Sequence, residues 1–135
     1  MASCIFCEII SRERPADILA ENDDVMVWLS LEHHPIVVPK LHVPDLFGLS
    51  DVLGAVLMRE TVRVARAVRT GLHCDGIYVT QTNGEAAGQS VFHLHLHVYP
   101  RWLPGSPNRI NLSARIDRPA RQALAEAIKR VLDGD

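Results

Sequence analysis

Five short stretches of the chain consist mainly of apolar or β-branched residues, and this pattern predicts β-strands. The stretches are residues 18–20, 25–29, 36–38, 77–82 and 92–99. Turn-forming residues separate the first two, which suits a hairpin. Prolines flank the third, where strand ends tolerate them best. The pattern therefore predicts five short strands.

A longer period, with apolar residues three or four positions apart, predicts two helices. The first covers residues 49–70, with Ser50 as its N-cap and Gly71 placed to end it. The second covers residues 118–132, with Asp117 as its cap. Few helices separate the strands, so we predict an α+β fold: an antiparallel five-stranded sheet with the long helix packed on it and a C-terminal helix.

Length and charge limit the number of domains and the classes of partner. The 135 residues suit a single domain whose core needs no disulfides. A net charge of −2 argues against a nucleic-acid partner, which usually requires a basic excess. The chain has no apolar run of about 18 residues and no basic, then apolar, N-terminal segment. We therefore expect no membrane partner and a cytoplasmic location.

Three histidines alternate with apolar residues at positions 93–97 and are the main candidates for chemistry. Alternate side chains of a strand share a face, so His93, His95 and His97 are expected to point the same way. Such a row suits proton transfer, metal binding or attack on an electrophile. Its ends would lie about 13 Å apart, too far for one metal to bind all three. The three histidines must therefore have different roles.

A polar loop with two glycines, residues 83–90, leads into this strand. Its backbone N–H groups can approach an anion, and Asn83, Gln89 and Ser90 add neutral hydrogen-bonding groups. Beside nucleophilic imidazoles, these groups suit a phosphoryl group. A plain hairpin loop is the alternative interpretation.

Cys4 and Cys7 form a C-x-x-C pair near the N-terminus. The pair is either half of a zinc site or a redox pair. A redox motif should follow a strand, and this one does not, so zinc is the better interpretation and two buried thiols are the alternative. A structural zinc site needs two more ligands, and His42 and His93 are the candidates.

Taken together, these residues resemble the histidine-triad (HIT) nucleotide-binding family. The resemblance rests on HLHLHVYPR at residues 93–101, on NGEAAGQSVF just before it, and on CIFCEII and VVPKLHV earlier in the chain. It covers a core of residues 3–101, and residues 102–135 extend the same domain, which spans residues 1–135. The resemblance implies a two-layer α+β fold that dimerises through the long helix and an edge strand.

The resemblance also implies catalytic roles for His95 and His97. In the family the middle histidine, here His95, attacks an α-phosphorus and forms a nucleotidyl-histidine. His97 matches the histidine that contacts phosphate oxygens. Gln89 and Ser90 match positions near the phosphate and leaving group, and Asn83 matches a nucleotide contact. Zinc-bearing members bind the metal through residues that match Cys4, Cys7, His42 and His93.

We therefore predict a HIT-type hydrolase or nucleotidyl transferase that acts on the α-phosphate of a nucleoside phosphoramidate or a dinucleoside polyphosphate. The expected ligand is a purine nucleotide or a nucleotide conjugate, the expected cofactor is structural zinc, and the expected assembly is a homodimer. A metalloenzyme that uses the triad as ligands is disfavoured by the strand geometry.

The other alternative is a zinc-containing nucleotide-binding regulatory or scaffold protein with little turnover. One departure from the family pattern favours it. The segment of residues 28–34, which lines the nucleotide pocket in the family, is shorter than usual and carries Ser30 in place of an aspartate. His34 matches the family histidine that precedes the apolar strand.

Overall fold

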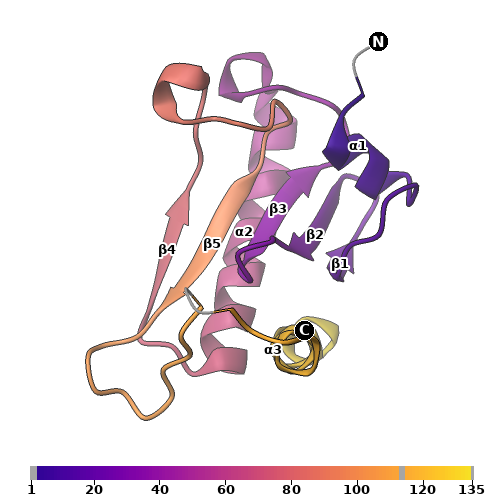
Figure 1. Cartoon of the computed structure of the whole chain (residues 1–135). Coiled ribbons are helices and arrows are strands. Elements are labelled where there is room, and N and C mark those ends of the chain that lie inside the picture. Colours follow the sequence, from indigo (N-terminus) through magenta and orange to yellow (C-terminus); the bar gives the residue numbers. More distant parts are fainter. Residues whose placement is uncertain (1–2, 113–114, 135) are drawn as a thin grey trace.

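The computed structural model describes residues 3–112 and 115–134, and its centre is a five-stranded antiparallel sheet (Figure 1). The spatial order of the strands is β1-β2-β3-β5-β4. Their bounds are β1 Ile18–Glu21, β2 Val25–Leu29, β3 Pro35–Pro39, β4 Gly76–Thr80 and β5 Leu96–Arg101. The α-helices are α1 Ile5–Ile10, α2 Asp51–Leu72 and α3 Arg118–Asp133, and the 3-10 helices are η1 Leu46–Gly48 and η2 Glu85–Ala87. The predicted α+β class is confirmed.

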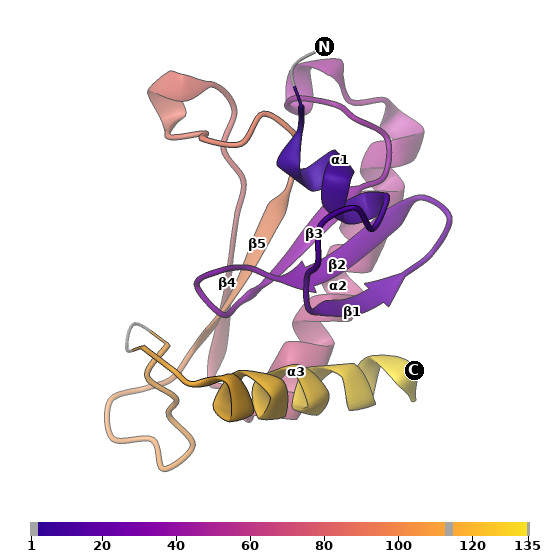
Figure 2. The same ribbon diagram turned by 45° about the vertical axis from the view of Figure 1, so that its right-hand side comes forward.

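The two long helices form a layer with one face of the sheet. In Figure 1, α2 runs behind the strands, and Figure 2 shows α3 crossing the end of the sheet below them. Both helices contribute to the main apolar core together with inward-facing residues of β1, β2, β3 and β5. This core includes Leu19, Val27, Val37, Val64 and Ile128.

The short helix α1 covers part of the opposite face (Figure 2). Its Phe6 and Ile9 form a second apolar cluster with Trp28, Ile36 and other residues of β2 and β3. The strands β2 and β3 are therefore buried along their whole length. Burial on both faces explains why their sequences are continuously apolar rather than alternating.

Both predicted helix caps are confirmed. Ser50 Oγ accepts the Leu53 N–H at 3.2 Å at the start of α2. Asp117 Oδ1 accepts the Ala120 N–H at 2.9 Å at the start of α3. Each side chain satisfies one of the backbone donors that a helix leaves free in its first turn.

The predicted end of α2 at Gly71 is wrong. The helix continues to Leu72, and His73 follows it in the left-handed conformation with φ 51°. Gly71 has a packing role instead, because a Cβ atom there would lie 2.5 Å from the carbonyl oxygen of Ala127 in α3. The missing side chain therefore allows α2 and α3 to approach closely.

The predicted span of the last strand is also wrong at both ends. Residues 92–95 precede β5, and the Leu94 N–H donates to the Val43 carbonyl at 2.7 Å. At the other end the strand continues through Pro100, which pairs with Ile77 of the edge strand β4. Pro100 lies beyond the part of β5 that pairs with β3, so its missing N–H is tolerated there.

None of the helices in the described ranges has the length and apolar character that a membrane span requires.

Candidate functional site

The side chains of residues 93–98 alternate between two environments, as their pattern predicts. Leu94 and Val98 are buried in the main core beneath α2. His93 and His95 lie on the other side, near the ring of Phe6 in α1. The histidine row therefore faces away from the long helices, and each ring has its own partners.

His93 points into a cluster with Cys4, Cys7 and His42, whose possible ligand atoms all lie within 4.8 Å of one another. His93 Nδ1 is 3.2 Å from His42 Nδ1 and 3.5 Å from each sulfur. His93 Nε2 donates to the Pro39 carbonyl at 2.7 Å, so the lone pair of Nδ1 faces the cluster. Two thiols and two imidazoles can hold a metal ion tetrahedrally.

Helix α1 brings the two thiols together. Cys4 is the N-cap of this helix, and its sulfur accepts the Cys7 N–H at 3.4 Å. The C-x-x-C spacing thus places both sulfurs at one helix end. Burial and the neighbouring Cys4 raise the pKa of the Cys7 thiol to about 11. The set suits a divalent cation, which would stabilise the thiolate form that binds metals.

His95 is held in one tautomer by the backbone. Its Nδ1 donates to the carbonyl oxygen of His93 at 2.8 Å, so Nε2 carries a free lone pair. Burial lowers the pKa of His95, and the ring is therefore neutral near pH 7. A neutral imidazole with a free Nε2 can act as a nucleophile.

His97 contacts His34, which immediately precedes the neighbouring strand β3. Its Nδ1 lies 2.8 Å from Nε2 of His34, and Tyr99 stacks on His34 with ring centroids 3.8 Å apart. Burial, with a smaller effect of each ring's histidine neighbour, lowers the pKa of His34 to about 3 and that of His97 to about 4. Both rings are therefore neutral near pH 7, and an N–H of one ring donates to the lone pair of the other.

A cleft of about 970 Å³ opens beside His95 and His97. Its walls are largely apolar and come from α1, from β2 and from the loop after β2. These wall residues include Ile5, Phe6, Ile9, Trp28, Leu29 and Leu31. Ser90, Asp17, Arg118 and Arg121 also line the cleft. The arrangement can hold a flat apolar group while presenting its polar end to two imidazoles.

Asn83 and Gln89 are engaged in the loop structure instead of lining this cleft. Gln89 is buried, and its amide donates to the Pro44 carbonyl at 2.6 Å and accepts the Gly84 N–H at 2.7 Å. Asn83 Oδ1 accepts the Leu46 N–H at 2.8 Å. Both side chains fasten the loop of residues 83–90 to the segment before α2.

Arg121 connects α3 to the short loop between β2 and β3. Its guanidinium donates to Asp17 at 2.7 Å, to the Ser30 carbonyl at 2.9 Å and to the Leu29 carbonyl at 3.2 Å. It also lies 2.8 Å from His33 Nδ1. Burial raises the pKa of Asp17, but hydrogen bonds from two α3 arginines outweigh it, and the net shift is downward.

The sequence did not indicate the roles of Arg121 and Asp17. The two residues are 104 positions apart, and neither belongs to a recognisable motif. His34 matched a family position, but its contact with His97 spans 63 positions. Only the three-dimensional arrangement brings each of these residues to its partner.

Comparison with known proteins decides the family. The family description "HIT domain" matches residues 11–102 of the chain. The chain belongs to the HIT family. This HIT protein is 35% identical to Protein hit of Bacillus subtilis, over 76% of this chain and 74% of that protein. It is 32% identical to Adenylylsulfatase HINT3 of Arabidopsis thaliana, over 96% of this chain and 69% of that protein.

A solved structure of the family has the same fold as this HIT protein. The Zn-bound histidine triad family protein from Mycobacterium smegmatis is 33% identical, covers 98% of each chain and superposes with a TM-score of 0.80. The relatives of this chain include one that is named for a hydrolase activity, the Arabidopsis adenylylsulfatase.

Proposed function

We propose that this HIT protein is a hydrolase or nucleotidyl transferase that acts on the α-phosphate of a nucleotide conjugate through a nucleotidyl-His95 intermediate. The observation that carries the proposal is the fixed tautomer of His95, whose free Nε2 stands at a nucleotide-sized cleft. The adenylylsulfatase activity named for the Arabidopsis relative supports a substrate that carries a nucleotidyl group.

A purine nucleotide fits the two ends of the cleft. The apolar walls, with the rings of Phe6 and Trp28, suit a base. Ser90, His95 and His97 lie where they would surround the α-phosphate. The substrate classes that match this arrangement are nucleoside phosphoramidates and dinucleoside polyphosphates.

The reaction takes place in two displacements at phosphorus. The lone pair of His95 Nε2 forms a bond to the α-phosphorus while the bond to the leaving oxygen or nitrogen breaks. The leaving group keeps that electron pair, and a leaving amine takes a proton from solvent. Water then attacks the same phosphorus, the P–N bond breaks, its electrons return to Nε2, and the proton of water passes to solvent. Another acceptor in place of water would give transfer.

His34 and Ser30 orient His97 for this reaction. The Ser30 hydroxyl oxygen lies 3.2 Å from His34 Nδ1; with the hydroxyl as donor, the proton of His34 resides on Nε2. That N–H donates to His97 Nδ1 at 2.8 Å, so the proton of His97 resides on its Nε2. An N–H in this position donates to a phosphate oxygen and stabilises the charge that grows there in the transition state.

We also propose that Cys4, Cys7, His42 and His93 bind zinc in a structural role. The thiol and imidazole donor set fits this ion, and the related M. smegmatis protein is Zn-bound. Bound zinc would fix the ring of His93, whose backbone carbonyl orients His95.

The proposed assembly is a homodimer formed through α2 and the edge strand β4. Val52, Met58 and Val62 of α2 and Tyr78 and Val79 of β4 are exposed apolar residues. One side of β4 pairs with β5 and the other side is the edge of the sheet. Unpaired edges and apolar patches favour association.

The function is tested by turnover of adenosine 5′-phosphoramidate. Replacing the nucleophile, His95→Ala, should lower kcat at least about 10³-fold, while His73→Asn at the exposed end of α2 should retain wild-type kcat. Full activity of His95→Ala would refute the proposal. Tight binding of the nucleotide by the wild-type protein without turnover would support the regulatory alternative instead.

A further inference from the structure

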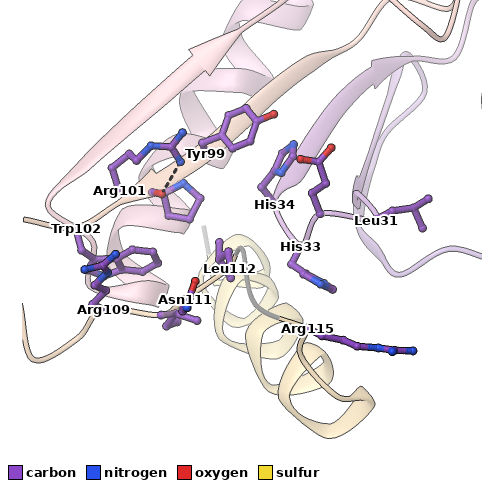
Figure 3. A pocket seen from close by; sticks show the side chains of 13 residues that line it. Leu31, His33, His34, Tyr99, Arg101, Trp102, Arg109, Asn111, Leu112 and Arg115 are labelled. Atoms are coloured by element: carbon purple, nitrogen blue, oxygen red, sulfur yellow. Dashed lines mark hydrogen bonds between the residues drawn. The ribbon is translucent and has the colours of Figure 1, made fainter.

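A second cavity, of about 710 Å³, lies beside the nucleotide cleft, and the reaction steps proposed above do not use it (Figure 3). The two cavities share Leu31, Glu32 and His33 of the loop between β2 and β3 as lining residues. Residues 109–112 and 115 form much of the remaining wall, beyond the range that the HIT family description matches. A cavity of this size can hold a small molecule.

The second cavity is too far from the nucleophile to hold part of the proposed substrate. The ring centroids of His95 and His97 are 4.8 Å apart, those of His97 and Tyr99 are 5.6 Å apart, and the guanidinium carbon of Arg101 follows at 5.0 Å from the Tyr99 centroid. The backbone from His95 to Arg101 spans about 20 Å. Groups bonded to the α-phosphorus stay close to His95, so a ligand of the second cavity is a different molecule.

Packing fixes the apolar part of the cavity lining. The indole N–H of Trp102 donates to the Leu72 carbonyl at 3.4 Å. Ile110 and Leu112 pack against the main core, and Figure 3 shows Leu112 on the side of the cavity next to α3. The cavity is therefore bounded by packed residues and offers an apolar and aromatic surface to a ligand.

Arginine side chains lie on both sides of this apolar surface. Figure 3 shows Arg101 and Arg109 on one side of Leu112 and Arg115 on the other. The described residues that line the cavity include one carboxylate, that of Glu32. Guanidinium groups bind carboxylates and phosphates through paired hydrogen bonds. Positive charge on both sides of an apolar surface fits a ligand that carries an oxyanion at each end.

The three guanidinium groups have N–H donors left for a ligand. The guanidinium of Arg101 lies over the rings of Tyr78 and Tyr99, 5.5 Å and 5.0 Å from their centroids, and donates to the carbonyl of the preceding residue at 3.3 Å. Most of its five N–H donors remain free. Within the ranges that the structure describes, the side chains of Arg109 and Arg115 form no ion pair. An oxyanion can therefore bind without displacing a carboxylate.

From this arrangement we infer that the second cavity binds a small organic anion that has a carboxylate or phosphate group at each end and a planar apolar body between them. One end pairs with Arg101 and Arg109, the other end pairs with Arg115, and the body lies against Trp102 and Leu112. The ligand is not the substrate, so the inference goes beyond the proposed function and does not depend on it.

The two tryptophans of the chain allow a direct test, because Trp28 lines the nucleotide cleft and Trp102 lines the second cavity. Their indole N–H signals in NMR correlation spectra are assigned with Trp28→Phe and Trp102→Phe. The wild-type protein is then titrated with biphenyl-4,4′-dicarboxylate, and we expect a saturable shift of the Trp102 signal. Biphenyl-4-carboxylate has the same body and one oxyanion fewer, so its Kd should be at least about tenfold higher.

Arg115→Gln tests the assignment of the two ends. The second carboxylate loses its partner in this variant, so the preference for the dicarboxylate over the monocarboxylate should fall below about threefold. Arg66→Gln, at an exposed arginine of α2 outside the cavity, is the matched control and should keep the full preference. The bisphosphate on the same body, titrated in the same way, shows which oxyanion the site prefers.

Three results would overturn the inference: no shift of the Trp102 signal, a shift confined to Trp28, or an undiminished preference for the dicarboxylate in Arg115→Gln. The titrations involve no turnover, so their outcome is independent of the proposed function.

Discussion

The chemistry of the cleft depends on where four histidine rings carry their protons. One backbone carbonyl fixes the tautomer of His95, and another fixes that of His93. Burial lowers the pKa of His34 and His97 far enough that both stay neutral near pH 7. The alternating pattern was sufficient to predict the shared face of the row. The contact between His34 and His97 could not be predicted, because the pattern of one strand says nothing about its neighbour.

The buried ring of His34 makes stability depend on pH. Its pKa is about 3 in the folded protein against 6.5 ordinarily, so the unfolded chain binds more protons between these values. The stabilisation is complete above pH 6.5 and is lost as pH falls from 6.5 toward 3. At about pH 5 the loss should be about 2 kcal/mol for this ring.

Urea unfolding at pH 7.5 and pH 5 checks this expectation. The free energy of unfolding should fall by about 2 kcal/mol more in the wild-type protein than in His34→Asn, whose amide does not titrate. The histidines that do not contact His34 are present in both proteins, so their contributions cancel in the comparison. Equal losses in the two proteins would show that His34 is not the group responsible.

At the scale of elements, the two terminal helices complete the site that the sheet begins. Helix α1 supplies two thiols and an apolar wall, and α3 supplies the arginine that holds the loop after β2. The C-x-x-C spacing and the cap at Asp117 were visible in the sequence. The contact of α3 with the loop was not, since a solvated arginine and a buried one look alike in a helical pattern.

Arg121 positions the wall of the nucleotide cleft. Arg121→Met would remove the guanidinium hydrogen bonds to the Ser30 and Leu29 carbonyls, and the loop should lose its fixed position. We expect KM for a nucleotide substrate to rise about tenfold while kcat changes less than about threefold. Arg118 also pairs with Asp17 but does not reach the loop, so Arg118→Met is the matched control.

Steady-state kinetics of the two variants separates positioning from general destabilisation. A fall in kcat as large as the rise in KM, or the same rise in Arg118→Met, would contradict the assigned role. Thermal unfolding of both variants shows whether each remains folded at the assay temperature.

The cysteine and histidine cluster should bind one zinc ion per chain. Elemental analysis of the purified protein should find it, and Cys4→Ser/Cys7→Ser should remove it, because serine is a poor zinc ligand. Cys74→Ala is the control, since this thiol is buried away from the cluster. Zinc retained in the double variant, or lost in Cys74→Ala, would contradict the ligand assignment.

At the scale of the whole molecule, the antiparallel sheet and its helical layer could be predicted from residue patterns. The limits of β5 and α2 could not, because they depend on partners distant in sequence: Val43 for Leu94 and Ala127 for Gly71. A cavity of about 710 Å³ has a similar origin, since the segment after β5 and the loop between β2 and β3 line it together.

The exposed apolar face of α2 predicts self-association. Sedimentation should give twice the chain mass, and Val62→Glu should shift the protein toward monomer, because a carboxylate is costly in an apolar interface. Leu31→Glu, at a residue that is 93% exposed beside the cleft, should leave the assembly unchanged. A wild-type protein that sediments as a monomer would contradict the proposed dimer.

The central claim is that His95 becomes covalently attached to the nucleotide, and one measurement tests it directly. The protein is mixed with diadenosine triphosphate, quenched within milliseconds in mild base and digested, and its peptides are analysed by mass spectrometry. We expect an adenylate on the peptide that contains His95 and none in His95→Ala. Turnover by the wild-type protein with no adduct, or with the adenylate on a different residue, would contradict it.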